Sequence, residues 1–194
     1  MISIEQQFPI YSAEDSIRQK DWAAGTSRIC ESTELIIPAS GPLRPDWRTV
    51  SYAPAWLKMF DEVLVNALDQ MVKMSEEVIG DRVTRISIGF TDGRFRVENN
   101  GRGIPCEYHS VGKCWLPELL MGRLFQSTNH VKRSGTVDEI VGGVNGIGSK
   151  IPQLLSSEFT LETYDLARGR WYYQQWRNKM TERGEPKIFR TKVT

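Results

Sequence analysis

The chain has 194 residues and a mass of 22.2 kDa, which allows one domain or at most two small ones. Hydrophobic residues make up 40% and charged residues 25% of the sequence, a globular composition that excludes extended disorder. The 25 basic and 24 acidic residues leave a net charge of +1, which argues against a dedicated nucleic-acid clamp.

Membrane contact and a disulfide framework are not expected either. No apolar run approaches the roughly 18 residues that a membrane-spanning helix needs. The three cysteines cannot all pair, so we expect reduced thiols in an intracellular protein. Cys106, His109 and Cys114 lie close together in the sequence, but a structural zinc site needs a full set of ligands and usually a tight cysteine pair.

The first part of the chain is predicted to be an arm and the rest to be the body of the fold. Residues 1–50 are expected to be irregular, apart from a short helix over residues 13–20, and the body is expected to span residues 51–194. A long helix is predicted from Pro54 to about Val78, because apolar side chains recur at helical spacing. These side chains are Leu57, Phe60, Leu64, Leu68 and Met71.

A β-hairpin is predicted after this helix, because apolar and polar residues alternate on both sides of a Thr91-Asp92-Gly93 turn. Two short helices and then three strands follow, over residues 117–125, 151–155, 159–164, 170–176 and 188–194. This order predicts a two-layer α/β sandwich, in which helices cover one face of a mixed, mostly antiparallel sheet. Because the sequence stops inside the last predicted strand, we expect the chain to be the N-terminal part of a longer protein.

One polar pair on the long helix is a candidate for chemistry. Glu62 and Asn66 lie one helical turn apart, on the face opposite the apolar side chains. An amide oxygen can ligate Mg²⁺, and a carboxylate can accept a proton from an attacking water. The alternative is an ordinary solvated helix face, which the same two residues would also form.

Two glycine-rich segments indicate a nucleotide or phosphate ligand. After the hairpin, Asn99-Asn100-Gly101-Arg102-Gly103 combines small residues with an amide that can accept a hydrogen bond from an exocyclic amine, such as that of adenine. Residues 143–150 place several glycines and Lys150 directly before a predicted helix, an arrangement that binds anions. Each segment taken alone could instead be an ordinary turn.

The order of these three segments resembles that of the GHKL ATPases, which include gyrase-type topoisomerases and the MutL repair proteins. Five stretches are similar to the ATPase domain of eukaryotic and viral type II DNA topoisomerases. They are YAPAWLKMFDEVLVNALDQ (52–70), VENNGRGIP (97–105), WLPELLMGRLFQSTNH (115–130), VGGVNGIGSK (141–150) and YYQQWRNKM (172–180). Asn99 stands where gyrase has Asp, which favours the eukaryotic and viral branch. The resemblance implies a Bergerat-type ATP fold for residues 51–194.

The resemblance also implies that the chain binds ATP and Mg²⁺, and it gives the motif residues roles. Glu62 would be the general base, Asn66 the Mg²⁺ ligand, and Lys150 a catalytic charge at the phosphates. Asn99 would recognise adenine, residues 127–129 would contact ribose and phosphate, and residues 143–150 would wrap the triphosphate. The other implied nucleotide-binding residues are Gly101, Gly103, Ile104, Ser127, Thr128, Asn129, Gly143, Val144, Asn145, Gly146, Ile147, Gly148 and Ser149.

An enzyme of this family would use ATP to close a homodimer, the N-gate, across a DNA segment. Residues 1–50 would be an arm exchanged between subunits, and DNA would be contacted mainly by parts of the enzyme outside this chain. The location would be the nucleus or a viral replication compartment. The family's transducer domain carries a lysine that reaches the γ-phosphate, and the sequence ends before it, so we expect hydrolysis by this chain alone to be slow or absent.

Two other functions remain open from the sequence. One is a different GHKL enzyme, such as a MutL-type repair protein, and the other is a nucleotide-binding dimerisation module without turnover. A separate question is whether the eight basic residues within 168–192 contact DNA. We favour a solvated strand edge for them, because phosphate binding needs a patch that is continuous in space.

Overall fold

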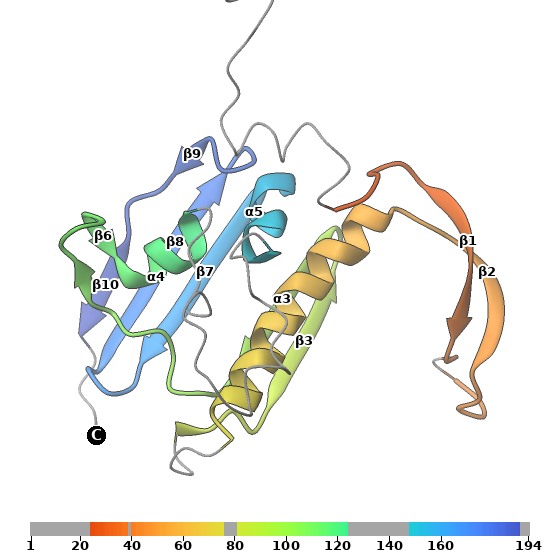
Figure 1. Ribbon diagram of the computed structural model, residues 1–194, viewed down its shortest axis with the longest axis horizontal. Helices are drawn as coiled ribbons and strands as arrows, with labels where there is room; N and C mark the ends of the chain where they lie inside the picture. Colours follow the sequence, from red (N-terminus) through yellow and green to blue (C-terminus); the bar gives the residue numbers. More distant parts are fainter. Residues whose placement is uncertain (1–23, 39, 76–80, 124–147, 191–194) are drawn as a thin grey trace, which may run out of the picture.

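The computed structural model describes residues 24–38, 40–75, 81–123 and 148–190, and its elements follow the predicted order (Figure 1). The helices are α3 (Pro54–Lys73), α4 (Leu116–Gly122) and α5 (Ile151–Leu155), and a 3₁₀ turn, η3, spans Gly148–Lys150. The strands are β1 (Cys30–Ile36), β2 (Asp46–Tyr52), β3 (Ile86–Thr91), β4 (Arg94–Asn99), β5 (Tyr108–His109), β6 (Cys114–Trp115), β7 (Glu158–Asp165), β8 (Arg170–Arg177), β9 (Glu182–Arg183) and β10 (Lys187–Arg190).

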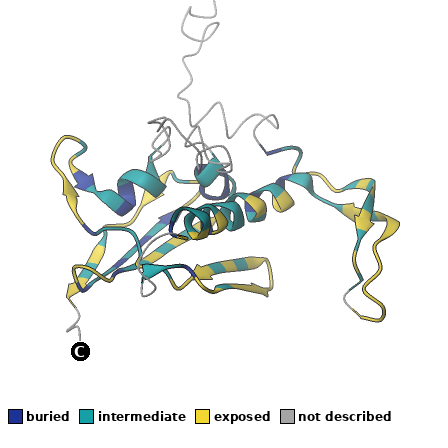
Figure 2. Ribbon diagram, turned by 60° about the horizontal axis from the view of Figure 1, so that its bottom comes forward, coloured by how far each residue is buried: buried dark blue, intermediate teal, exposed yellow. Residues whose placement is uncertain are grey.

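The predicted two-layer arrangement is confirmed, with α3, α4 and α5 on one side of the layer that contains β3, β4, β7 and β8 (Figures 1 and 2). Every pairing between described strands is antiparallel. The described strands divide into a sheet of order β10-β8-β7, with β9 paired to β8, and three separate pairs, β1–β2, β3–β4 and β5–β6. They therefore form several sheets instead of the single sheet that was predicted. The β3–β4 hairpin is not paired with β7. Instead, the loop after β4 contacts β7.

Helix α3 begins as predicted, with Pro54 in its first turn, where a missing N–H costs nothing. Its apolar side chains do not form one buried stripe, because the helix has packed neighbours on two sides. Ala55 and Met59 are buried in a cluster with Ile151 of α5. Phe60 contacts the β3–β4 hairpin, with its ring 5.1 Å from that of Phe90.

Three of the five apolar residues whose spacing predicts α3 are more than one third exposed. Leu57 is 54%, Leu68 38% and Met71 37% exposed. The apolar side chains whose spacing predicts α3 therefore do not all share one buried face, because the small Ala55 and Ala67 supply part of it.

The long strands β7 and β8 carry much of the remaining core. They pair over their whole length, from Glu158 opposite Arg177 to Asp165 opposite Arg170. Alternate residues of β8 point into the interior, so Tyr172 and Trp176 are 0% and 1% exposed. Bulky inward-facing aromatic residues of this kind supply a large share of the apolar burial of a small domain.

The prediction that residues 1–50 are irregular was wrong for the part that the structure describes. Residues 30–36 and 46–52 form the β1–β2 hairpin, which projects from the N-terminal end of α3 (Figures 1 and 2). Strand β2 runs across the expected boundary between residues 50 and 51. The helix predicted over residues 13–20 lies outside the described residues.

All three cysteines are free thiols. In the described ranges, no helix combines the length and the apolar character that a membrane span would require.

Candidate active site

Glu62 and Asn66 lie one turn apart on α3, as predicted, but not on a solvated face. The side chain of Glu62 is only 18% exposed. The amide nitrogen of Asn66 donates a 2.6 Å hydrogen bond to the main-chain oxygen of Glu62. Since the nitrogen is used within the helix, the amide oxygen of Asn66 is the atom that it can offer to a cation.

The Glu62 carboxylate lies against the end of the second glycine-rich segment. A Cβ atom added to Gly148 would overlap Oε2 of Glu62, so this close approach requires glycine. The other oxygen, Oε1, forms an ion pair with the ammonium of Lys58, and the hydrogen bond to Glu62 is the main cause that raises the pKa of Lys58. The fold thus brings a partly buried carboxylate of α3 and the glycine segment into direct contact.

The two asparagines at the end of β4 have different surroundings: Asn99 is the last residue of the strand and Asn100 follows it. Asn100 is used by the fold, because its side-chain oxygen accepts hydrogen bonds from the N–H groups of Thr84 and Arg85, at 3.0 and 2.8 Å. Asn99 is exposed, and its side-chain oxygen accepts a 3.1 Å hydrogen bond from the N–H of Gly101. Both side chains are exposed, but that of Asn100 uses its oxygen and its nitrogen in hydrogen bonds to residues 84 and 85, so Asn99 is the better candidate for a ligand contact.

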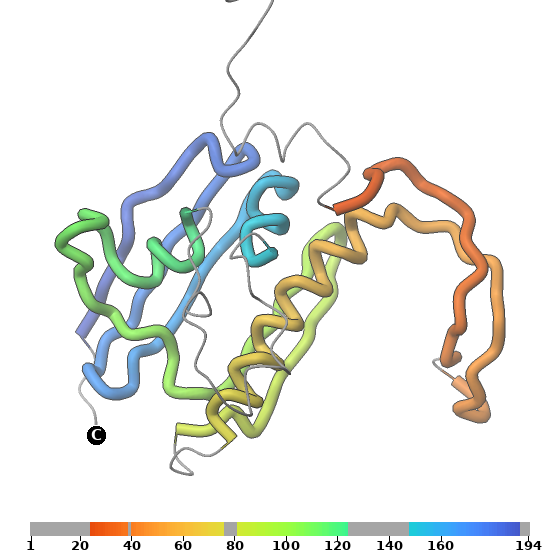
Figure 3. The backbone as a smooth tube through the Cα atoms, viewed as in Figure 1, coloured from red at the N-terminus to blue at the C-terminus, as the bar shows by residue number. Residues whose placement is uncertain are grey.

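The loop after β4 is fixed against the end of β7. Figure 3 shows the chain leaving β4 and crossing to the side of β7 and β8. Gly103 adopts a φ of +77°, and a Cβ at this position would overlap the main-chain oxygen of Tyr164. The N–H of Ile104 donates a 2.9 Å hydrogen bond to Oγ1 of Thr163, and the N–H of Cys106 donates a 2.8 Å bond to Oδ2 of Asp165. Gly101, Gly103 and Ile104 therefore lie on one loop that β7 holds in place, and Asn99 is the strand residue directly before it.

Sequence reasoning missed Thr163 and Asp165. Asp165 is 2% exposed and also accepts a 3.1 Å hydrogen bond from the N–H of Arg168. Two polar residues at the end of a predicted strand are the only signal that the sequence contains. Their role depends on a loop about 60 residues earlier in the chain, which local patterns do not reveal.

Lys150 is fully buried, which the sequence did not predict. Its ammonium donates hydrogen bonds to the main-chain oxygen of Leu120 in α4 and to Oγ of Ser149, the latter at 2.7 Å. Burial lowers the pKa of Lys150 from 10.5 to about 8. These bonds direct the ammonium toward α4.

The depressed pKa of Lys150 predicts that the contribution of this residue to stability becomes more favourable as the pH rises. Below about pH 8 the lysine is charged in both the folded and the unfolded state, so the full cost of burying the charge is present. Between about pH 8 and 10.5 the folded protein releases the proton while the unfolded chain keeps it, and the cost declines. The free energy of unfolding, relative to that of Lys150→Met, should rise by about 2 kcal/mol between about pH 7.5 and 9.5. Urea titrations at the two pH values measure this difference, and parallel pH profiles would contradict it.

Eight of the predicted site residues lie outside the described residues. They are Ser127, Thr128, Asn129, Gly143, Val144, Asn145, Gly146 and Ile147. The described site residues are Glu62, Asn66, Asn99, Gly101, Gly103, Ile104, Gly148, Ser149 and Lys150. Within the described ranges, no three His, Cys, Asp or Glu side chains are grouped so that they could hold a metal ion.

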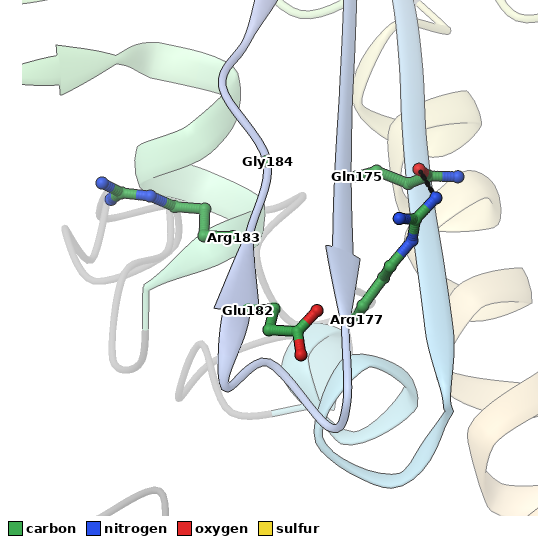
Figure 4. A pocket seen from close by; sticks show the side chains of 5 residues that line it. All are labelled: Gln175, Arg177, Glu182, Arg183 and Gly184. Atoms are coloured by element: carbon green, nitrogen blue, oxygen red, sulfur yellow. Dashed lines mark hydrogen bonds between the residues drawn. The ribbon is translucent and has the colours of Figure 1, made fainter.

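Two arginines of the C-terminal strands pair with acidic residues of the protein. Arg177 lies 3.4 Å from Glu158, and Arg183 lies 2.7 Å from the buried Glu118. Both arginines line a pocket between β8 and β9. In Figure 4 the Arg177 side chain is hydrogen-bonded to Gln175, and the Arg183 side chain points away from Arg177. These contacts agree with the preferred interpretation of a solvated strand edge.

Comparisons with solved structures identify the class of protein to which the fold belongs. No family model matches the sequence. The ATPase region of topoisomerase II from Saccharomyces cerevisiae superimposes with a TM-score of 0.85 and 30% identity, over 98% of this chain and 48% of that chain. The ATPase and transducer domains of the Balamuthia mandrillaris enzyme give a TM-score of 0.87 and 29% identity, over 98% of this chain and 47% of that one. The fold is therefore that of topoisomerase II ATPase regions.

The curated relatives are DNA topoisomerase 2 proteins. That of Penicillium chrysogenum is 41% identical over 145 residues, which are 74% of this chain and 9% of the relative. That of Candida glabrata is 35% identical over 184 residues, 95% of this chain and 12% of the relative. The mimivirus protein is 34% identical over 142 residues, 73% of this chain and 11% of the relative.

These relationships place the chain with the N-terminal ATPase regions of eukaryotic and viral DNA topoisomerase 2, as the sequence motifs implied. The chain spans 9% to 12% of the length of these curated relatives and about half of the solved ATPase regions. The alternative of a MutL-type repair protein is not supported, because the relatives described above are topoisomerases.

Proposed function

We propose that this chain is the ATP-binding and ATP-hydrolysing N-gate region of a type II DNA topoisomerase, in which ATP-driven dimerisation is coupled to DNA strand passage. The observation that carries the proposal is the contact between the Glu62 carboxylate and Gly148. This contact joins a general-base candidate to a glycine segment suited to phosphates.

The described residues fit a nucleotide with Mg²⁺. The amide oxygen of Asn66 is suited to hold the ion, and the exposed Asn99 is suited to recognise the adenine amine. Glycines at 101, 103 and 148 let the main chain approach its neighbours without a Cβ clash. When bound, Mg²⁺ neutralises charge on the phosphates. We assign triphosphate binding to residues 143–150, and ribose and phosphate contacts to residues 127–129.

Glu62 is assigned the general-base role. Its carboxylate is 18% exposed, so it is accessible while most of its surface is shielded from solvent. A base must lie within hydrogen-bond reach of the proton that it accepts, and the oxygen beside Gly148 faces the glycine segment. Single-turnover hydrolysis of ATP distinguishes this assignment from a binding module without turnover. In an enzyme, the wild type should hydrolyse ATP slowly and Glu62→Gln should not. In a binding module, neither protein should hydrolyse ATP.

Asn99→Ala and Asn100→Ala should separate ligand recognition from folding. Asn99→Ala should weaken binding of an ATP analogue about tenfold and reduce its preference over a GTP analogue, since a hydrogen bond to the base is lost. Asn100→Ala should instead lower the free energy of unfolding by about 1 kcal/mol, because its hydrogen bonds to Thr84 and Arg85 are lost. Calorimetric titration and urea unfolding of both variants measure the two effects. Equal affinity loss in the two variants would contradict the assignment.

The β1–β2 hairpin supports a role in a homodimer. Its exposed face carries Leu35 opposite Trp47, which are 53% and 68% exposed, and Ile37 and Leu43 nearby are 62% and 76% exposed. An isolated two-stranded hairpin is marginally stable in water, so apolar side chains on it favour a covering partner. We assign the first 50 residues and this hairpin to the subunit interface of the N-gate.

Sedimentation velocity with and without the Mg²⁺ complex of a non-hydrolysable ATP analogue tests the proposed function. The analogue should convert monomers to dimers, because ATP has higher affinity for the closed state. An unchanged sedimentation coefficient at saturating analogue would contradict the N-gate proposal.

The complete enzyme would act on DNA through regions outside this chain. The relatives support an intracellular location, in the nucleus or in a viral replication compartment. They include fungal and viral proteins, and a further relative from Dictyostelium discoideum is mitochondrial.

A further inference from the structure

Lys58 lies one helical turn before Glu62 on α3, and its ammonium forms an ion pair with Oε1 of Glu62. We propose that Lys58 is a positioning residue, which holds the Glu62 carboxylate so that its second oxygen faces the glycine segment at Gly148. The inference rests on the proposed role of Glu62 as the general base. It adds Lys58 as the residue that orients the Glu62 carboxylate.

The pair is not explained by helix stability alone. A glutamate that precedes a lysine by four residues stabilises a helix more than the reverse order, and here the lysine comes first. Pairs on exposed helix faces contribute little, but this carboxylate is only 18% exposed while the Lys58 side chain is 41% exposed. The lysine therefore reaches from the solvent edge toward a shielded acid.

The two oxygens of the carboxylate have different surroundings. Oε1 is bound by Lys58, and Oε2 lies against Gly148. Partial rotation of the carboxylate about its terminal bond would turn the free oxygen away from Gly148, and the ion pair opposes that rotation. Because a misplacement of about 1 Å can reduce a rate about 100-fold, an acid on a flexible side chain benefits from such a restraint.

Asp61 is the other acid that Lys58 can reach. Its Oδ2 atom lies 3.8 Å from the Lys58 ammonium, and its side chain is 53% exposed. The contact with Glu62 is shorter and less exposed, so Glu62 is the main partner. Asp61→Asn thus changes the charge near Lys58 and leaves the proposed restraint in place.

The test compares affinities for two nucleotide complexes of the whole chain, both with Mg²⁺. One is ADP with aluminium fluoride, which mimics the transferring phosphoryl group together with the attacking water, and the other is a non-hydrolysable ATP analogue. Lys58→Met should weaken binding of the aluminium fluoride complex about tenfold or more and change affinity for the ATP analogue less than about twofold. Lys58→Arg should restore most of the loss, since it keeps the cation.

Two control variants define the specificity of the effect. Lys73→Met removes a lysine from the same helix, and Asp61→Asn removes the weaker partner of Lys58; both should bind the two complexes as the wild type does. Equal affinities of Lys58→Met and the wild type for the aluminium fluoride complex would overturn the proposal. Equal weakening of both complexes by Lys58→Met would also overturn it, because a general structural effect would explain that result.

The same measurements separate a failure of this inference from a failure of the proposed function. If the folded wild type binds neither complex, the nucleotide-binding proposal fails and the role of Lys58 fails with it. If Glu62→Gln binds the aluminium fluoride complex as tightly as the wild type, Glu62 is not the base and the positioning role is overturned, while nucleotide binding stands. If only Lys58→Met lacks an effect, the proposed function stands and this inference alone is wrong.

Discussion

Gly103→Ala should lower the free energy of unfolding by about 3 kcal/mol, because the new side chain meets two obstacles at once. The first is the backbone, since a φ of +77° is strained for alanine. The second is the main-chain oxygen of Tyr164, which a Cβ would overlap and which belongs to strand β7. A backbone atom within a paired strand cannot move aside as the end of a flexible side chain can.

Gly93→Ala is the matched control for this prediction. Gly93 has a φ of +65° in the turn between β3 and β4, but no atom lies within 4 Å of the position that its Cβ would occupy. The control should cost only the backbone strain, about 1 kcal/mol. Chemical denaturation measures the loss of stability in both variants. The difference between the two losses is the cost of the overlap with β7. Equal losses would show that the loop after β4 is not held as tightly as described.

Asn66→Ala should reduce the affinity for a Mg²⁺-bound ATP analogue about 10- to 100-fold, because a cation loses a direct oxygen ligand. Stability should change little, since the lost 2.6 Å hydrogen bond to Glu62 lies within one helix. The most informative result is how the affinity for the analogue depends on Mg²⁺. The wild type should bind the analogue more tightly with Mg²⁺ than with EDTA, and the variant should bind it almost equally in both.

Asp69→Asn provides the comparison on the same helix. Asp69 follows Asn66 by three residues and has no assigned role in the ligand site. Its substitution should change the affinity by less than about twofold, as expected for a residue outside the site. If Asn66→Ala retained the full dependence on Mg²⁺, the metal would have to be held by other residues.

The fold was predictable where local patterns have a strong physical cause. The β3–β4 hairpin follows from alternation around Asp92-Gly93, and Gly93 adopts the positive φ that the turn requires. The β1–β2 hairpin was missed because its strands carry Ser, Thr and Glu at many positions, so no apolar alternation marks a buried face. A strand that is not packed against a core lacks the signal by which strands are recognised.

The candidate site was predictable as motifs but not as contacts. The sequence indicated Glu62, Asn99 and the glycine segments, and the motif order suggested that they act together. It could not show that Asn100 is used by the fold, or that the Lys150 ammonium is buried beside α4. Both facts depend on hydrogen bonds to residues far along the chain. Spacing within a motif carries no information about such bonds.

A single calorimetric titration decides whether the residues of this chain form a nucleotide site. The wild-type chain should bind a non-hydrolysable ATP analogue in the presence of Mg²⁺, with saturation and a stoichiometry of about one per chain, as a single site requires. Absence of binding at millimolar analogue, by protein that circular dichroism shows to be folded, would contradict the claim.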